Sequence, residues 1–406
     1  MKTVLIYTSP ARGHLYPIMD IALELKTQGY RVVVQSLKAE RPVVEAEGIE
    51  YLDISPAIEA LPLEDYQESN PIRQIKSAFQ TWAKRAAFEI EDLKESYRKI
   101  QPDFLMIDVN TWGAAAFAES LQRPWGIFHP YCLLLASNDT PAFGPGFLPP
   151  QNILHQLRDK MVRKLVDSAI KSPLQEMNEI REELGVSPFR KYEDIFSRPN
   201  LIFYRTAEPF DYSRKFWPQN VLQLGPGLWA PKAEKPEWIE ELPHPRILVS
   251  VSTEKQNDAQ IIESALEGLA GDEYGLIITT GAQEAEKFHL SNGNTRLCKF
   301  LPHSAVIDEV DLLVSHGGMG STQRALAAGV PVCVVPCGRD QRETARRVEY
   351  NQSGVMLPLN KLNGSSLKKA VKAALRKKEG AQKIAKAFAE KGGAKKAVLE
   401  IEKLVA

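Results

Sequence analysis

The sequence predicts an α/β fold with two halves, each built around a parallel sheet. In both halves of the 406-residue chain, short apolar runs alternate with segments of helical composition. A stretch rich in Pro and Gly at 225–236 separates the two series, which is typical of a linker. The length also suits two domains better than one core. Two such halves imply a cleft, and open parallel sheets bind ligands beyond the carboxyl ends of their strands.

The first half begins with a predicted βαβ unit. Its strands are Val4–Tyr7 and Arg31–Gln35, and a loop, Thr8–Pro17, leads into the helix Ile18–Gln28. Such a unit gives neighbouring parallel strands with a right-handed crossover. Two more strands and then a helical region are expected further along this half, at Phe104–Asp108, Pro124–Phe128 and 151–183.

The second half repeats the same plan from about Arg246. The apolar runs are short enough for buried parallel strands, and the segment between the first two has helical composition. The expected strands are Ile247–Val251, Gly275–Thr279, Val310–Ser315 and Val330–Val335. The expected helix, between the first two strands, is Asp258–Ala270.

Composition narrows the classes of function. Lys plus Arg and Asp plus Glu each number 51, so the net charge is zero, which argues against a nucleic-acid-binding protein. The four cysteines lack the spacing of a metal site and favour a reducing compartment. No apolar run approaches the roughly 20 residues that span a bilayer, and the apolar N-terminus is too short for a signal peptide. We therefore expect a cytoplasmic protein without a membrane span.

A glycine-rich turn at His316–Thr322 is the most informative motif. It follows the expected strand Val310–Ser315 and precedes a segment of helical composition that ends at Gly329. Glycines let the backbone approach a ligand closely, and the N-terminus of the next helix attracts negative charge. The turn therefore suits a phosphate or diphosphate, with His316 as a further donor. A simple tight turn is the alternative.

Other motifs occur in a fixed order around this turn. They are Gly13-His14-Leu15-Tyr16-Pro17, Ser250-Val251-Ser252-Thr253, Phe300-Leu301-Pro302-His303, His316-Gly317-Gly318 and Asp340-Gln341. With these motifs in this order, the chain resembles the GT-B glycosyltransferases of family 1. The resemblance implies two Rossmann-like, doubly wound domains that face each other across a cleft. It places an acceptor-binding domain at 1–224, a linker at 225–243, a donor-binding domain at 244–382 and a helix at 383–406 that returns to the first domain.

The resemblance also implies how a nucleotide sugar would be held. The ring of Phe300 would lie against the base and the backbone of Leu301 would read its edge, while Thr253 would reach the diphosphate. The remaining donor-binding positions are His316, Gly318, Gly320 and Ser321 for the diphosphate, and Asp340 and Gln341 for the hexose. The motifs do not choose between UDP and dTDP.

Three of these positions also have an ordinary structural explanation. Phe300 could be a core residue, Thr253 the N-cap of the following helix, and Asp340 an exposed cap on the helix that begins near Arg342. The chain also departs from its relatives at two positions. Ser252 stands where glycine is common, and Arg324 stands where many plant relatives have a ribose-binding Glu.

His14 and Asp108 are the expected catalytic residues. Both lie at the carboxyl ends of strands in the first sheet. A histidine suits the removal of a proton from an acceptor hydroxyl, and in relatives an Asp at the second position hydrogen-bonds that histidine. A loop histidine without a chemical role, and an Asp that caps the helix after Asn110, are the alternatives.

The resemblance implies an inverting transferase with a hydroxyl-bearing, largely apolar small molecule as acceptor: a flavonoid, polyketide, macrolide or terpenoid. No Asp-x-Asp occurs in the sequence, and a helix N-terminus with His316 can replace a metal, so we expect no metal and no cofactor beyond the nucleotide sugar. Aromatic residues that could line the acceptor pocket are Trp82, Trp112, Tyr131 and Phe143.

Three other functions are compatible with parts of this pattern. A non-hydrolysing UDP-sugar 2-epimerase has the same fold and a diphosphate site. A catalytically silent homologue could act as the partner of another transferase, although His14, Asp340 and Gln341 are all present. A dinucleotide oxidoreductase fits least, because no Gly-x-Gly-x-x-Gly follows the first strand of either half.

Overall fold

The computed structural model describes residues 1–68, 70–252, 258–271, 273–288 and 293–406. Within these residues the chain forms one seven-stranded and one six-stranded sheet, and every neighbouring pair of strands is parallel. The strands are β1 Thr3–Tyr7, β2 Arg31–Ser36, β3 Glu50–Asp53, β4 Phe104–Asp108, β5 Trp125–His129, β6 Leu201–Tyr204, β7 Val221–Gln223, β8 Arg246–Ser250, β9 Gly275–Thr279, β10 Thr295–Cys298, β11 Leu312–Ser315, β12 Val332–Val334 and β13 Gly354–Met356.

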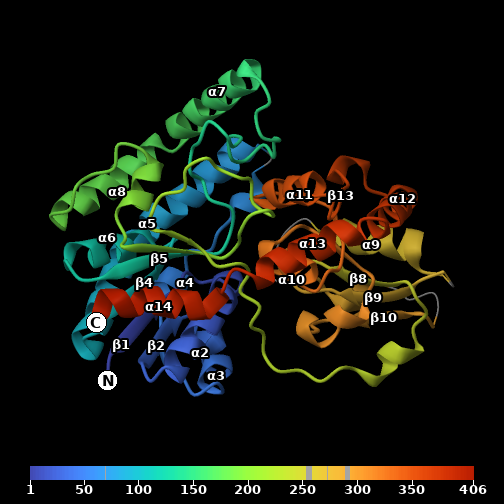
Figure 1. The fold of residues 1–406 in the computed structure, drawn as a ribbon, viewed down its shortest axis with the longest axis horizontal. Helices are drawn as coiled ribbons and strands as arrows, with labels where there is room; N and C mark the ends of the chain where they lie inside the picture. Colours follow the sequence, from blue (N-terminus) through green and yellow to red (C-terminus); the bar gives the residue numbers. More distant parts are fainter. Residues whose placement is uncertain (69, 253–257, 272, 289–292) are drawn as a thin grey trace.

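Helices cover both faces of each sheet (Figure 1). The α-helices are α1 Arg12–Leu15, α2 Met19–Thr27, α3 Arg41–Glu45, α4 Pro56–Glu59, α5 Pro71–Ile100, α6 Trp112–Ser120, α7 Ile153–Ala169, α8 Lys171–Glu183, α9 Ala259–Leu269, α10 Met319–Ala327, α11 Gln341–Tyr350, α12 Gly364–Leu375, α13 Lys378–Ala389 and α14 Gly393–Val405. None of the helices in the described part of the chain combines the length and apolar composition needed to cross a bilayer.

The first sheet has the order β3-β2-β1-β4-β5-β6-β7. Its central strands are buried on both faces, and successive side chains of β1 enter different cores. Val4 and Ile6 pack with α2 and α14, whereas Leu5 and Tyr7 pack with α5, α6 and α8. This arrangement explains why β1 is a continuous apolar run rather than an alternating one.

The second sheet has the order β10-β9-β8-β11-β12-β13. Helices α10, α11 and α13 pack in the core on one face, and α9 and α12 pack in the core on the other. In each sheet the strand order reverses between two strands that are neighbours in the sheet but not consecutive in the sequence. These are β1 and β4 in the first sheet and β8 and β11 in the second. The predicted fold class, two doubly wound α/β units, is confirmed.

The segment before α2 differs from the predicted loop. Residues Arg12–Leu15 form α1, and Tyr16–Ile18 form a 3-10 turn, η1, that leads directly into α2. Pro17 is compatible with this structure because it lies at the start of η1, where a backbone N–H has no partner within the helix. His14 therefore lies in a helical turn rather than in an open loop.

The chain crosses between the halves twice. The first crossing, after β7, ends before η5 (Glu237–Glu241), whose Ile239 belongs to the core of the second half. The second crossing follows α13, which still packs on α10, so it occurs after Ala389 and not at 383. Helix α14 then packs against α2 of the first half, as Figure 1 shows.

Candidate active site

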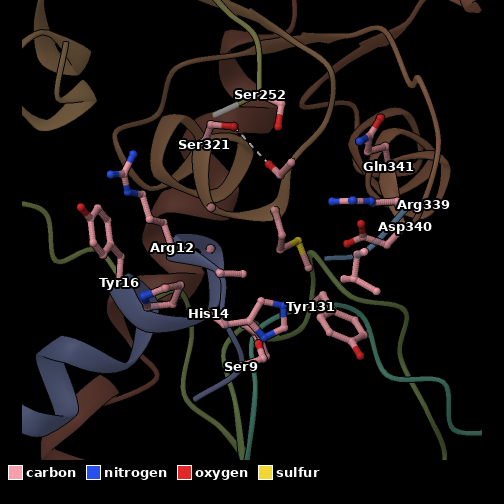
Figure 2. A pocket seen from close by; sticks show the side chains of 18 of the residues that line it. Ser9, Arg12, His14, Tyr16, Tyr131, Ser252, Ser321, Arg339, Asp340 and Gln341 are labelled. Atoms are coloured by element: carbon pink, nitrogen blue, oxygen red, sulfur yellow. Dashed lines mark hydrogen bonds between the residues drawn. The ribbon is translucent and has the colours of Figure 1, made fainter. Parts of the chain in front are cut away.

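A cavity of about 1020 Å³ lies between the halves and receives side chains from both. It opens at the carboxyl ends of β1 and β8, the strands at which the order of each sheet reverses. Crevices at such positions are the usual binding sites of open α/β sheets. Figure 2 shows His14 and Tyr131 on one side of this cavity and Ser321, Asp340 and Gln341 on the other.

His14 and Asp108 form a hydrogen-bonded pair. The side chain of His14, in the single turn of α1, is 16% exposed in the cavity, while Asp108, at the end of β4, is fully buried behind it. His14 Nδ1 lies 2.7 Å from Asp108 Oδ2. Because a carboxylate only accepts, the ring carries its hydrogen on Nδ1 and donates it. This leaves Nε2 as the nitrogen that can take up a proton.

Asp108 also shapes the backbone beyond it. Its Oδ1 accepts the N–H of Asn110 at 2.8 Å, and its carbonyl accepts the Thr111 hydroxyl at 2.7 Å. This is a local turn stabilised by a side-chain oxygen. The N-cap of α6 is Thr111, so the alternative that Asp108 caps this helix is wrong. One carboxylate therefore holds both the turn and the ring of His14.

Sequence reasoning missed the role of Asn110. The Tyr131 hydroxyl donates to Asn110 Oδ1 at 2.7 Å, which orients the amide so that Nδ2 lies 3.4 Å from His14 Nε2. Burial raises the pKa of Tyr131 well above its usual value, so its hydroxyl stays protonated and remains a donor. Asn110 thus approaches the basic nitrogen of His14 as a weak donor, because the distance is long for a hydrogen bond. The position of Asn110, two residues after Asp108 in the sequence, could have indicated this role.

Asp340 presents a carboxylate to the same cavity. It occupies the N-cap position of α11, but its side chain makes no capping hydrogen bond, so the structural alternative does not account for it. Burial raises the pKa of Asp340, and a hydrogen bond from its own backbone N–H and the positive charge of Arg339 partly oppose that shift. In Figure 2, the Asp340 carboxylate faces the part of the cavity that holds His14 and Tyr131.

Gln341 has a structural role that the sequence did not indicate. Its Oε1 accepts the N–H groups of Cys337 and Gly338 at 2.8 and 3.0 Å, which holds the turn between β12 and α11. The carbonyl oxygen is thus already used, although the residue lines the cavity. Arg339, next to it, pairs with Asp65 of the first half through Nη2 and Oδ1 at 2.9 Å. These residues are 274 positions apart, and no local pattern predicts the contact.

The glycine-rich turn lies between β11 and α10. His316 is 8% exposed and lines the cavity together with Gly318, Gly320 and Ser321. A Cβ at Gly318 would lie only 2.7 Å from Nε2 of His316, so the absence of a side chain there lets the ring fold back over the helix N-terminus. The first N–H groups of α10 lack partners within the helix, which creates a favourable position for an anion.

Cationic side chains surround this turn. Arg324 lines the cavity and donates to the backbone carbonyl of Trp229 at 3.0 Å. Burial, with the charges of Arg324 and His316, lowers the pKa of His303 to about 4, so His303 is neutral near pH 7. Arg12, from the first half, also lines the cavity and pairs with Glu40. His303 adds no charge and Arg12 is balanced by Glu40, so Arg324 and the N-terminus of α10 are the groups here that favour a negatively charged ligand.

The remaining predicted donor residues have different outcomes. Phe300 is 54% exposed and lines the cavity, so the alternative of a core phenylalanine is wrong. Leu301 lines the cavity and packs against the core of the second half. Thr253 lies outside the residues that the structure describes, whereas its neighbour Ser252 lines the cavity.

Three of the four predicted acceptor-binding aromatics line the cavity: Trp82, Tyr131 and Phe143. Trp112 does not, and its prediction is corrected. It is 3% exposed and packs edge-to-face on Phe79, with 5.0 Å between ring centroids, in the core between α5 and α6. The compositional argument could not separate the two tryptophans, because a large aromatic residue fits either place.

Within the described residues, no group of three or more His, Cys, Asp or Glu side chains could hold a metal ion. The polar groups of the cavity include the His14–Asp108 pair, Asp340, and His316 before the N-terminus of α10. Such a set can move a proton and hold a polyanion.

Comparisons with known proteins agree with this arrangement. Residues 263–404 match the family model for the C-terminal domain of erythromycin biosynthesis protein CIII-like proteins. The chain is 29% identical over 387 residues to 4'-demethylrebeccamycin synthase of Lentzea aerocolonigenes, covering 92% of this chain and 91% of the relative. It is 25% identical over 401 residues to the NDP-glycosyltransferase YjiC of Bacillus subtilis (strain 168), covering 97% and 95%. The crystal structure of the glycosyltransferase VinC in complex with dTDP superposes with a TM-score of 0.72 at 18% identity, covering 100% and 99%.

The chain is a glycosyltransferase of the GT-B fold. The resemblance to family 1 that the ordered motifs indicated is thereby confirmed. The 2-epimerase and oxidoreductase alternatives are set aside. In this glycosyltransferase, His14 and Asp108 belong to the first half, while the glycine-rich turn and Asp340 belong to the second, so the cavity is complete only when both halves contribute.

Proposed function

We propose that this glycosyltransferase moves a hexose from UDP- or dTDP-sugar to a hydroxyl of a small, largely apolar acceptor, with inversion and without a metal. The main support is the His14–Asp108 pair, 2.7 Å apart, in the cavity that also receives Asp340 and His316. A base, a sugar-binding carboxylate and an anion site within one cavity are what direct displacement at an anomeric carbon requires.

His14 acts as the base. Its Nε2 takes the proton of the acceptor hydroxyl while the oxygen attacks the anomeric carbon. Asp108 holds the ring through Nδ1 and stabilises the imidazolium that forms. The bond from the anomeric carbon to the diphosphate breaks on the opposite face, and its electron pair leaves with the diphosphate. No covalent glycosyl-enzyme forms, so the configuration inverts.

The departing diphosphate is held at the start of α10. There the N–H groups around Gly320 and Ser321, together with His316, face the developing negative charge. Asp340 accepts hydrogen bonds from the hydroxyls of the hexose, and the exposed ring of Phe300 offers a face to the base. All of these groups line the same cavity.

The acceptor occupies the part of the cavity lined by the first half. Aromatic and aliphatic side chains dominate there, including Trp82, Phe143 and Leu63. One relative is a 4'-demethylrebeccamycin synthase, which supports a natural-product acceptor, and another is an NDP-glycosyltransferase, which supports a nucleotide-sugar donor. The dTDP complex of VinC, by its fold, supports a nucleoside diphosphate in the donor site.

Replacement of His14 by Ala tests the base directly. We expect turnover to fall by about 10²–10⁴-fold, because proton removal loses its acceptor, while UDP or dTDP binding persists. Turnover is measured with UDP-glucose and dTDP-glucose against a panel of flavonoid, macrolide and terpenoid alcohols. NMR of the product gives the anomeric configuration. His244→Ala is the matched control, because His244 forms an exposed pair with Asp311, with Nδ1 and Oδ2 2.6 Å apart.

Other results would contradict parts of the proposal. Unchanged turnover in the His14 variant would remove it as the base, and retained configuration would exclude direct displacement. Loss of turnover on dialysis against EDTA would show a metal requirement. If the protein binds UDP or dTDP but transfers no sugar to any acceptor, it is a silent homologue that supports another transferase.

A further inference from the structure

Helix α7 has its apolar side directed away from the protein. Five large apolar residues of this one helix are more than half exposed, and in Figure 1 the helix lies at the outer edge of the first half. We call them the α7 stripe: Ile153 (65% exposed), Leu154 (71%), Leu157 (54%), Met161 (61%) and Leu165 (51%). Their spacing of three and four residues places them along one side of the helix.

The side of α7 that faces the protein carries buried polar groups beside the partly buried Val162 and Val166. Asp159 is 1% exposed and accepts two hydrogen bonds from Arg158, at 3.0 and 3.1 Å. Arg163 donates to the backbone carbonyls of Ser137 and Thr140, both at 2.8 Å. A surface helix normally has the opposite polarity. The sequence of α7 therefore suits a helix that is covered on its outer side as well.

We propose that the α7 stripe is the two-fold interface of a homodimer, in which the α7 helices of two copies pack on each other. A large apolar residue exposes roughly 190 Å² in an extended reference chain, so the stripe leaves about 570 Å² per copy. Two stripes together reach about 1,100 Å², which is at the lower limit for a specific interface. The largest apolar patch of a typical monomer is about 300–600 Å² and is often functional. At about 570 Å², the α7 stripe alone lies at the upper end of that range.

Charge favours a second copy over a lipid surface. The exposed charged residues of α7 are Lys160, Lys164 and Asp167, and the chain as a whole has no net charge. Helices that dock on anionic membranes usually bring four to eight basic residues. A straight apolar stripe flanked by charges of both signs matches helix–helix packing, and a two-fold axis lets the same patch serve both copies.

Such a dimer would support one wall of the cavity, a consequence that rests on the proposed function. The loop 136–147 is held by α7 on one side, through Arg163 and through Arg158, whose guanidinium lies 4.0 Å from the centre of the Phe147 ring. On the other side, Glu343 of α11 accepts the N–H groups of Gly144 and Gly146 at 2.8 and 2.9 Å. Phe143 of this loop lines the cavity.

Sedimentation velocity of the full-length protein at micromolar concentration tests the proposal. We expect a species of twice the 45.4 kDa chain mass for the wild type. The double variant Leu157→Glu, Met161→Glu should sediment as a monomer, because four carboxylates would then face each other across the interface. Leu399→Glu is the matched control, an exposed leucine (58%) on the helix α14, and should remain a dimer.

A milder variant guards against misfolding. Leu157→Ala should raise the dissociation constant of the dimer by about tenfold or more, with an unchanged circular dichroism spectrum. A wild type that is monomeric at these concentrations, or a dimer that survives the double substitution, would overturn the proposal. So would a monomer that binds phosphatidylcholine–phosphatidylglycerol vesicles through Leu157 and Met161. None of these measurements depends on turnover, so they fail or succeed independently of the proposed transfer reaction.

Discussion

Glu89 is a carboxyl group in the core of the first half. It lies on α5, is fully buried, and its Oε2 accepts the N–H of Gly113 at 2.9 Å. Gly113 belongs to α6, and α6 lies so close to α5 that a Cβ on Gly113 would collide with the backbone of Ala86. Loss of hydration raises the pKa of Glu89 to about 8, although the Gly113 N–H and the charge of Arg85 oppose the shift. Glu89 is therefore neutral at pH 7 in the folded protein.

This shift makes stability depend on pH. The unfolded chain releases the Glu89 proton near pH 4.5, whereas the folded chain keeps it until about pH 8. The free energy of unfolding of the wild type should therefore fall as pH rises between these values. Glu89→Gln removes this contribution. The difference in free energy of unfolding between the variant and the wild type should therefore shift in favour of the variant by roughly 4 kcal/mol between pH 4.5 and pH 8. Urea unfolding from pH 4.5 to 9 measures the difference.

The control for this prediction is Glu91→Gln on the same helix. Glu91 is 72% exposed and pairs with Lys94, so its replacement should leave the pH dependence of the wild type unchanged. Parallel unfolding curves for the wild type and Glu89→Gln across the pH range would mean that the buried carboxyl is not protonated in the folded state.

At the scale of elements, the junction of β11 and α10 combines two requirements for glycine. Gly317 has a φ of +93°, a conformation that disfavours other residues, and a Cβ there would also meet Val334. Gly318 has an ordinary φ of −58° and is required only by the close approach of the His316 ring. The same short motif therefore sets both the path of the backbone and the position of a side chain.

Gly318→Ala tests the position of that ring. The new Cβ would displace the His316 imidazole from the start of α10, so we expect UDP and dTDP to bind about 10–100-fold more weakly, the effect of losing one charge-assisted hydrogen bond. Isothermal titration calorimetry measures both affinities. Gly271→Ala is the control: Gly271 lies in the same half but does not line the cavity, and a Cβ there meets no atom within 4 Å. Equal affinities for both variants would place the diphosphate elsewhere.

Element boundaries show how far local patterns reach. The apolar runs predicted β4 and β9 with the bounds that the structure has, and most other expected strands to within two residues. The segment Arg12–Leu15 was expected as a loop because Gly13 and Pro17 usually interrupt helices. Packing of Leu15 and Ile18 into the core outweighs that local preference.

At the scale of the whole molecule, a buried ion network joins the two halves. Arg347 of α11 donates from Nε to Asp211 of the first half at 2.8 Å and from Nη1 to Glu343 at 3.0 Å, and all three side chains are at most 4% exposed. Its guanidinium also lies 4.2 Å from the centre of the Tyr212 ring. One cation thus balances two buried carboxylates from the two halves.

Arg347→Met should therefore be strongly destabilising. It leaves two buried carboxylates without their cation, and we expect the free energy of unfolding to fall by about 3–5 kcal/mol. Urea unfolding followed by tryptophan fluorescence measures the change. Arg342→Met, at an exposed position on the same helix, is the control and should have little effect. A similar, small loss for both variants would show that the halves do not depend on this network.

The amino-acid sequence alone determined those features of the fold that depend on interactions over only a few residues. These are the buried strands, the glycine turn before α10 and the linker, because periodicity, glycine and proline act locally. The order of the motifs added the family, and with it the expectation that His14 and Asp108 are partners.

Long-range packing settled the rest. It brought His14 within 2.7 Å of Asp108 across 94 positions, and Arg339 onto Asp65 across 274. It also placed Trp112 in the core while Trp82 lines the cavity, and directed the apolar side of α7 outward. Side chains of the same type have the same local preference, and their surroundings are decided by which distant segments pack beside them.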